Sequence, residues 1–267
     1  MNYWTQSPQN IFVAGHRGWP AKYPENTLVS FAAAIDAGVD QIETDVRCTA
    51  DGALVLIHDA LVDRTTNGTG KIEEMTLEAV RALDAGAWKD PSFAGCKIPT
   101  WEEFMTLIEQ HPTLTLDIEL KEYPIEGNEE RAYTTCDRVI ADLDARGMTD
   151  RVVLNTFSGK LHEYIQAKYG DRIRRHVFFP ERHLGEVTED PYAHAYCCCM
   201  FSREKGKRMA TAEEYAAMAA RGVQPWAGAG VRDAEGVDEA IACGAYLITC
   251  NNPDEILALL RARGRHV

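Results

Sequence analysis

The segment DQIETDVRCTADGALVLIHD, residues 40–59, contains two strand-like runs joined by a turn. Glu43 and Asp45 stand two residues apart in the first run, so a strand places their side chains on one face. Asp51–Gly52 between such runs is a strong hairpin signal, and the second run ends at His58. A two-residue turn there would place Asp45 opposite His58, with Glu43 on the same face. The hairpin therefore predicts two carboxylates and an imidazole on one surface.

Short apolar strands alternate with helical patterns along the chain, which is typical of a parallel sheet with crossover helices. The predicted barrel strands span residues 11–16, 41–47, 114–121, 151–156, 173–179, 195–201, 223–227 and 245–250. The predicted helices span residues 27–37, 100–110, 129–146, 159–168, 211–221, 234–243 and 253–263. Such strands in a chain of 267 residues predict a single α/β domain over residues 1–267, folded as a closed (β/α)₈ TIM barrel.

An extra strand and an insertion follow the second barrel strand. Residues 53–58 run back antiparallel to that strand, so they are additional to the barrel. Residues 59–98 are rich in turn sequences such as DRTTNGTGK and KDPSFAGCKIP. This segment is long for a loop between a strand and a helix, and it predicts an insertion on the catalytic face of the barrel.

The chain is strongly acidic, with 28 Lys and Arg against 41 Asp and Glu and a formal net charge of −13. A nucleic-acid partner is not expected, because the phosphate backbone requires basic patches. No apolar run is long enough to cross a bilayer, and the N-terminal residues show no secretory signal. The cysteines lie mostly in apolar, strand-like contexts typical of buried reduced thiols. We therefore expect a cytoplasmic protein without membrane insertion, and the oligomeric state stays open.

Chemistry-bearing side chains gather near the C-terminal ends of the first three barrel strands, where TIM barrels carry out catalysis. The third of these strands, LTLDIELK at 114–121, alternates two carboxylates and an ammonium onto one face. Buried, unpaired carboxylates are costly, and a hard divalent cation removes that cost. An all-oxygen ligand set favours Mg²⁺ or Ca²⁺ over Zn²⁺. The residues gathered there are His16, Arg17, Glu43, Asp45, Asp117, Glu119 and Lys121.

The cations and imidazoles among these groups complete a phosphoester site. Arg17 and Lys121 beside such a metal would bind a phosphate anion, the guanidinium through two oxygens and the ammonium as a point charge. His16 and His58 suit proton transfer near neutral pH, one accepting and one giving a proton. Each group alone also has a structural interpretation, as a strand-end histidine or a surface ion pair. Their convergence from three strands favours metal-assisted cleavage of a phosphodiester.

Other polar residues receive structural interpretations. Asp117 lies deeper in its strand and is predicted to be a hydrogen-bonding group inside the barrel rather than a metal ligand. In PENT, residues 24–27, Asn26 or Thr27 is predicted to cap the first helix. The remaining histidines have no matching context and are predicted to be surface or core residues; they are His111, His162, His176, His183, His194 and His266.

Several motifs carry a family resemblance. Over residues 13–121 they are HRG (16–18), PENT (24–27), IETDVRCTADGALVLIHD (42–59), RTTNGTG (64–70), IPTWEEF (98–104) and IELK (118–121). Later in the chain they are NTFS (155–158), GVQPW (222–226) and LITCNNPDEI (247–256). Together they resemble the glycerophosphodiester phosphodiesterase family, of the wider phospholipase-C-like barrel group. Segment 59–98 likewise resembles the insertion of that family.

The resemblance implies a (β/α)₈ barrel that hydrolyses glycerophosphodiesters to sn-glycerol 3-phosphate and an alcohol, with a divalent cation as cofactor. In the barrel group, cleavage can begin with attack by a neighbouring hydroxyl of the substrate. The implied roles are metal binding for Glu43, Asp45 and Glu119, proton transfer for His16 and His58, and phosphate binding for Arg17 and Lys121. Which histidine is the base stays open, and our hypothesis is that His16 is the base and His58 the acid.

Two late segments depart from the family pattern, WAGAG at 226–230 and TCNNP at 249–253. Trp226 is nevertheless expected to line the alcohol pocket, while the altered neighbours leave the head group and the substrate range open. The alternatives are a phosphodiesterase for a lysophospholipid or a sugar phosphodiester, and a non-catalytic phosphoester-binding module. The lack of a membrane segment or basic interfacial helix disfavours a lipid substrate. The presence of His16 and His58 disfavours a non-catalytic binding module, because such a module needs no acid–base pair.

Overall fold

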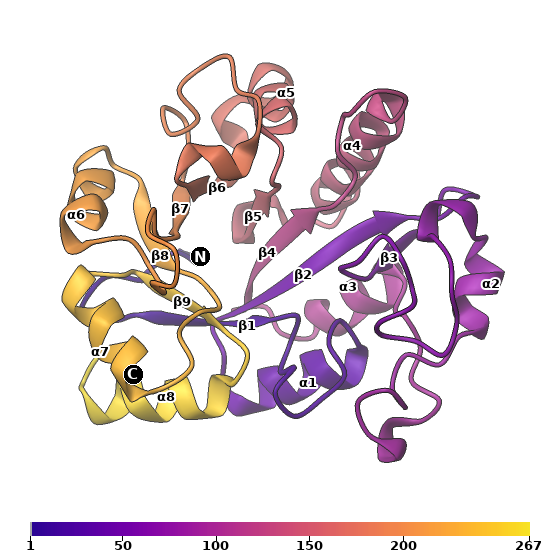
Figure 1. Cartoon of the computed structure of the whole chain (residues 1–267), viewed down its shortest axis with the longest axis horizontal. Helices are drawn as coiled ribbons and strands as arrows, with labels where there is room; N and C mark the ends of the chain where they lie inside the picture. The colour runs from indigo at the N-terminus through magenta and orange to yellow at the C-terminus, as the bar shows by residue number, and fades with distance from the viewer. Residues whose placement is uncertain (1) are drawn as a thin grey trace.

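The computed structural model describes residues 2–267, and Figure 1 shows strands at the centre with helices around them. The strands are hydrogen-bonded in the order β1-β9-β8-β7-β6-β5-β4-β2-β3, and a pairing of β1 with β2 closes the ring. Every pairing is parallel except that of β2 with β3. The closed (β/α)₈ barrel and its additional hairpin strand are therefore confirmed. The strands are β1 (Phe12–His16), β2 (Gln41–Cys48), β3 (Leu54–Leu56), β4 (Thr115–Leu120), β5 (Val152–Asn155), β6 (Arg174–Phe179), β7 (Cys197–Met200), β8 (Gln224–Ala227) and β9 (Leu247–Cys250).

The predicted helices are all present and lie outside the strands (Figure 1). The Thr27 side-chain oxygen accepts a hydrogen bond from the Ser30 N–H at 3.3 Å, so Thr27 is the cap of the first helix. No helix among residues 2–267 is both long and apolar enough to span a membrane. The helices are α1 (Leu28–Ala37), α2 (Leu77–Ala82), α3 (Trp101–Glu109), α4 (Glu129–Ala145), α5 (Gly159–Tyr169), α6 (Ala212–Ala220), α7 (Ala234–Cys243) and α8 (Pro253–Ala262). Short 3₁₀ segments are η1 (Ile72–Glu74), η2 (Pro91–Phe93), η3 (Thr149–Arg151), η4 (Gly170–Arg172) and η5 (Glu181–Leu184).

The barrel interior has an apolar lower layer. We call it the inner-barrel cluster; it consists of Phe12, Ala14, Val153, Cys197, Trp226 and Leu247, all buried. The strand register pairs Leu247 with Phe12 and with Trp226, so these side chains face the same side of the sheet. The cluster fills the barrel below the C-terminal ends of the strands. The polar inward-facing residues toward the C-terminal ends of the strands lie above it, whereas Gln41, Thr115 and Gln224 face inward near the cluster itself.

The hairpin register differs from the predicted one by a residue. Val46 pairs with Leu56 and Cys48 with Leu54, which sets Asp45 opposite Ile57 rather than opposite His58. The cause is a three-residue loop in place of the expected two-residue turn. The Thr49 N–H donates to the Ala53 carbonyl at 2.8 Å, and Gly52 adopts a left-handed φ of 85° between them. Only a residue that tolerates positive φ allows this longer turn.

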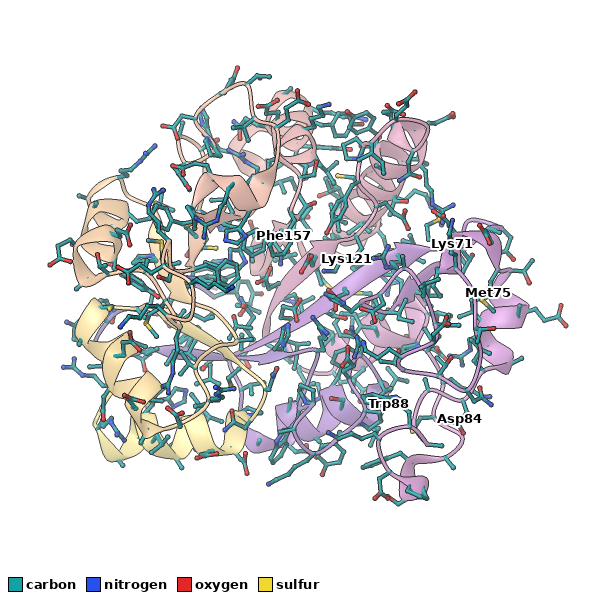
Figure 2. The ribbon with its side chains drawn as sticks, viewed as in Figure 1. Lys71, Met75, Asp84, Trp88, Lys121 and Phe157 are labelled. Carbon is teal, nitrogen blue, oxygen red and sulfur yellow. The ribbon has the colours of Figure 1, made fainter. Side chains whose placement is uncertain are left out.

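Residues 59–98 follow the hairpin and hold the unpredicted helix α2. Their apolar side chains form a separate buried cluster with β3, made by Val55, Ile57, Val62, Ile72, Val80, Ala85 and Ile98. Figure 2 shows Lys71, Met75, Asp84 and Trp88 of this segment at one side, with Lys121 and Phe157 nearer the centre of the barrel. The segment therefore packs on its own small core beside the barrel mouth.

Candidate active site

The predicted site residues do come together. Strand register pairs His16 with Glu43, and Asp45 with Glu119, so all four side chains face the barrel interior, from the end of β1, the middle of β2 and the end of β4. Glu43, Asp45 and Glu119 each offer a carboxylate oxygen within 4.8 Å of the others, and all three residues are buried. This trio is hereafter the carboxylate centre.

Lys121 and Arg17 lie against the carboxylate centre. Lys121 Nζ is 3.1 Å from Asp45 Oδ1 and also bonds to Glu119, while Arg17 Nε is 3.2 Å from Asp45 Oδ2. Burial favours a raised pKa for Asp45, but the Lys121 and Arg17 cations outweigh it and hold that pKa well below its usual range. The guanidinium and the ammonium are thus fixed beside the centre, where an anionic substrate would meet them.

The other two carboxyl groups of the centre resist ionisation. Burial, and then the charge of Asp45, raise the pKa of Glu43 well above its ordinary value. Burial raises the pKa of Glu119 to about 7, even though Lys121 acts in the opposite direction. Three buried carboxylates that lack enough positive charge for full ionisation are the donor set that a hard divalent cation prefers. These residues therefore fit a Mg²⁺ or Ca²⁺ ion.

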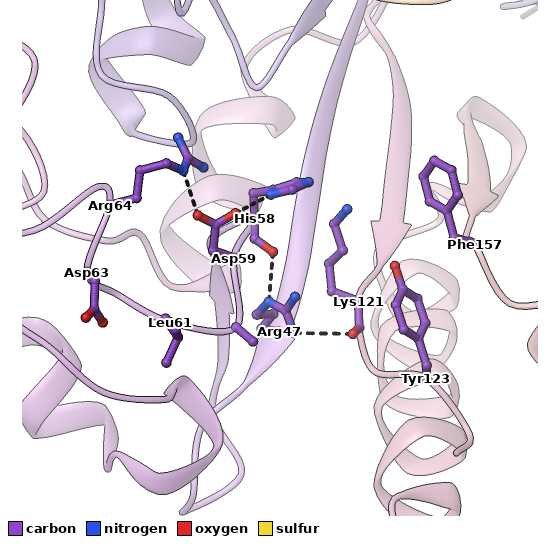
Figure 3. A pocket seen from close by; sticks show the side chains of 10 residues that line it. Arg47, His58, Asp59, Leu61, Asp63, Arg64, Lys121, Tyr123 and Phe157 are labelled. Carbon is purple, nitrogen blue, oxygen red and sulfur yellow. Dashed lines mark hydrogen bonds and ion pairs between the residues drawn. The ribbon is translucent and has the colours of Figure 1, made fainter. Parts of the chain in front are cut away.

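The two histidines have different partners. His16 Nδ1 lies 2.6 Å from Asn251 Oδ1, and because an amide oxygen only accepts, Nδ1 carries the proton and Nε2 is left as an acceptor. His16 Nε2 is 3.9 Å from Glu43 Oε2. Burial, and then the Arg17 cation, lower the pKa of His16 to about 4. His58 Nδ1 instead lies 2.6 Å from a carboxylate oxygen of Asp59 (Figure 3).

An arginine of segment 59–98 joins both sides of the site. Arg64 donates to Asp59 at 2.6 Å and, through both terminal nitrogens, to Glu25 at 2.8 and 2.9 Å. Glu25 in turn accepts from Arg17 Nη1 at 2.8 Å. Arg64 therefore links the carboxylate behind His58 to the carboxylate behind Arg17. Figure 3 shows the part of this chain from Arg64 through Asp59 to His58.

Asn26 supports the centre from the PENT loop. Its Nδ2 donates to Asp45 Oδ2 at 2.7 Å, and its Oδ1 accepts from the Thr44 hydroxyl at 2.9 Å. The sequence interpretation assigned Asn26 only a possible capping role and gave none to Glu25, Asp59, Arg64 or Asn251. All five lie in the family-like motifs, Glu25 and Asn26 in PENT, Arg64 in RTTNGTG, Asp59 at the end of segment 42–59 and Asn251 in LITCNNPDEI, so those motifs were the available signal.

Two adjoining cavities open at this end of the barrel. The first, hereafter the catalytic cavity, has a volume of about 270 Å³ and is lined by His16, Arg17, Glu43, His58 and Glu119 at one side. It is also lined by Phe157, Phe178, Phe201 and Gly228. The second cavity, about 550 Å³, shares His58 and Phe157 with the first and is also lined by Arg47, Arg64, Lys121 and Tyr123 (Figure 3).

Trp226 does not line either cavity, so its predicted place in the alcohol pocket is wrong. Its side chain is wholly buried in the inner-barrel cluster, and its ring lies 4.9 Å from that of His176. The reason is its height in the barrel, because Gly228, two residues further along the chain, reaches the cavity instead. Asp117 is a hydrogen-bonding group inside the barrel, as predicted, and accepts from Asn155 and His176.

The fold and the site define a (β/α)₈-barrel protein with a buried carboxylate centre between two histidines. The chain belongs to the glycerophosphoryl diester phosphodiesterase family, whose sequence profile matches residues 16–222. It is 41% identical over 150 residues to a glycerophosphodiester phosphodiesterase of Caldanaerobacter subterraneus subsp. tengcongensis, covering 55% of this chain and 58% of that one. It is 35% identical over 180 residues to a glycerophosphodiester phosphodiesterase of Bacillus altitudinis, covering 67% and 66%.

The fold matches solved structures over nearly the whole chain. The crystal structure of a glycerophosphodiester phosphodiesterase from Agrobacterium tumefaciens superposes with a TM-score of 0.74 at 25% identity, covering 93% of this chain and 99% of that one. By sequence, the chain spans about half the length of the curated relatives it matches, 46% and 58% for two of them. The family resemblance carried by the motifs is thus confirmed.

Proposed function

We propose that this chain hydrolyses glycerophosphodiesters to sn-glycerol 3-phosphate and an alcohol. The observation that carries the proposal is the buried carboxylate centre between His16 and His58, in a cavity that also holds a guanidinium. Family membership and the names of the relatives support it. The partner is a small-molecule phosphodiester. A non-catalytic binding module would not need two imidazoles at the two sides of the centre.

A divalent cation, Mg²⁺ or Ca²⁺, would be held by Glu43, Asp45 and Glu119 and would supply Lewis-acid activation of the bound phosphodiester and its hydroxyl. Arg17 and Lys121 bind the phosphoryl oxygens, and they stabilise the negative charge that builds there during cleavage. Both cations are already fixed by ion pairs to Asp45, so they need little reorganisation when substrate arrives.

The hydrogen bonds of the two histidines support His16 as base and His58 as acid. His16 has a neutral partner, Asn251, which leaves Nε2 free to take the proton of the attacking hydroxyl. His58 has an anionic partner, Asp59, which stabilises the imidazolium that must give its proton to the departing alkoxide. Arg64 keeps Asp59 in place for this role.

Turnover of glycerophosphocholine tests the proposal. The metal-stripped enzyme should be inactive in EDTA and regain activity with Mg²⁺ or Ca²⁺. Glu43→Gln and Glu119→Gln should each lower kcat by orders of magnitude without unfolding the protein, whereas Glu126→Gln, at an exposed carboxylate, should not. Full activity of the stripped enzyme in EDTA would refute the metal assignment, and no cleavage with any metal would refute the activity.

The histidine roles separate by leaving group. An activated ester such as a nitrophenyl diester needs little protonation on departure. Replacement of the acid, by His58→Ala, should therefore slow glycerophosphocholine cleavage far more than nitrophenyl cleavage. Replacement of the base, by His16→Ala, should slow both alike. Two variants with the same loss on both substrates would exclude an acid–base pair.

A further inference from the structure

A polar trio lies inside the barrel below the carboxylate centre. It comprises Asp117 on β4, Asn155 on β5 and His176 on β6, which are 1%, 2% and 4% exposed. Asp117 accepts from Asn155 Nδ2 at 2.6 Å and from His176 Nδ1 at 2.7 Å. All three residues line the catalytic cavity. We call this trio the polar floor.

Strand register explains the position of the polar floor. Glu119 pairs with Asn155, and Asn155 pairs with His176, so these side chains face the barrel interior together. Asp117 precedes Glu119 by two residues on the same strand and therefore faces inward one layer lower. Next below Asn155 on β5 is Val153 of the inner-barrel cluster. The polar floor thus closes the deep end of the catalytic cavity.

The polar floor presents two hydrogen-bond acceptors without partners. Asn155 turns its amide nitrogen to Asp117, and His176 turns Nδ1 to it, so that Nε2 of the neutral imidazole is left as an acceptor. Asn155 Oδ1 and His176 Nε2 remain, and neither buried atom has a hydrogen-bond partner among residues 2–267. A buried acceptor without a partner is costly, so this end of the cavity calls for a donor.

The walls and charges above the floor restrict that donor. Phe157, Phe178 and Phe201 form one wall as a stack, with ring centroids 3.9 and 5.8 Å apart. They offer only carbon surface, whereas Arg17 follows β1, which lies across the barrel from β6, the strand of Phe178. The Arg17 guanidinium attracts an anion and the Asp117 carboxylate of the floor repels one, so the phosphate of a bound substrate lies toward Arg17 and an uncharged end lies toward the floor.

We propose that the polar floor binds the terminal hydroxyl of the glycerol moiety, whose one proton is shared between His176 Nε2 and Asn155 Oδ1 in a three-centre hydrogen bond. The carbon chain of the glycerol then lies against the phenylalanine wall. This inference rests on the proposed function and adds to it the residues that select glycerol. His176 and Asn155 are specificity-determining residues, and Asp117 orients both of them.

Two substrates that differ in one hydroxyl test the inference. The first is glycerophosphoethanolamine, and the second is the same diester of propane-1,2-diol, which lacks only the terminal hydroxyl. A site built to bond a hydroxyl rejects an analogue without it strongly, so kcat/KM should favour the first substrate by a factor on the order of 100 or more. Equal kcat/KM values would overturn the inference and indicate that the floor holds only water.

Matched variants at one position separate binding from structure. His176→Asn can keep the bond to Asp117 through its amide nitrogen, but it has no atom at the Nε2 position. It should lower kcat/KM for glycerophosphoethanolamine and leave the propanediol diester nearly unchanged. His176→Gln reaches the Nε2 position and should recover part of the preference, and His194→Asn, at an exposed site, should change nothing. Equal losses on both substrates would show a merely structural role.

Binding to the wild-type protein decides the matter if the variants do not fold. In titration calorimetry, sn-glycerol 3-phosphate should bind more tightly than propane-1,2-diol 1-phosphate by a similar factor, and equal affinities would overturn the inference. The two proposals fail separately. A protein that cleaves neither diester refutes the proposed function, while the calorimetry still tests the floor. A protein that cleaves both diesters at one rate refutes only the floor.

Discussion

Asn26 supports the carboxylate centre while its own backbone is held in a strained conformation. Its replacement should therefore lower the free energy of unfolding by an amount that depends on the new residue. Its φ is 53°, in the left-handed region, and its buried side chain bonds to Asp45 and Thr44. Loss of the bond to the charged Asp45 costs about 1.5–3 kcal/mol, and the Thr44 hydroxyl left without a partner costs about 1–3 kcal/mol more. Asn26→Gly should therefore lower the free energy of unfolding by roughly 2.5–6 kcal/mol.

Asn26→Ala should be less stable still, because a Cβ in the left-handed region costs about 1–2 kcal/mol. The greater freedom of glycine in the unfolded chain offsets about 0.5–1 kcal/mol of that difference. The free energy of unfolding of the alanine variant should thus lie roughly 0–1.5 kcal/mol below that of the glycine variant. Alanine is the worse replacement here only because of the backbone conformation.

Urea unfolding of both variants in EDTA measures these differences without a contribution from bound metal. Ala33, inside helix α1 where the backbone is right-handed, is the control position, and there Ala33→Gly should lower the free energy of unfolding by roughly 0.5–1 kcal/mol. An Asn26→Ala protein more stable than Asn26→Gly would contradict the strained backbone. An Asn26→Gly protein as stable as wild type would show that the two side-chain bonds contribute nothing.

Three further changes test the site. Arg64→Lys replaces the guanidinium that donates to both Glu25 and Asp59 with a single ammonium, so kcat/KM for glycerophosphocholine should fall roughly 10-fold or more. An unchanged kcat/KM would show that the link from Arg64 to these two carboxylates does not support catalysis. Gly228→Ala places a Cβ 2.8 Å from Cys199 Sγ, so KM should rise as the catalytic cavity narrows. An unchanged KM would show that Gly228 does not border the substrate. Mg²⁺ at 100 times its Kd should stabilise the protein by about 2.7 kcal/mol in urea unfolding, but not a Glu43→Gln variant, and no stabilisation of wild type would contradict the metal site.

The barrel and the carboxylate centre were predictable because each depends on a short-range pattern. Apolar runs between helical patterns gave the strands, and a spacing of two residues put Glu43 and Asp45 on one face. The rule that TIM barrels use the C-terminal ends of their strands then brought Glu119 to the same place. These steps need only alternation within a strand and the order of strands.

The hairpin register required knowledge that the local pattern does not hold. Asp-Gly suits both a two-residue and a three-residue loop, and the choice depends on which residue takes positive φ. Here only Gly52 does, and the register shifts by one residue. His58 still reaches the cavities, because β3 ends at Leu56 and strand alternation no longer applies to the residues that follow.

The sequence could not predict how far along the barrel axis an inward-facing side chain lies. Alternation says that Trp226 and Gly228 both face the barrel interior, but the stagger between strands decides which of them reaches the cavity. The same reasoning explains why His176 was assigned no functional context. Its neighbours in sequence are apolar, and its relation to Asp117 crosses two strand pairings. A polar residue in an apolar strand of a closed barrel must find a partner inside it, so such a residue marks a candidate binding surface even without a motif.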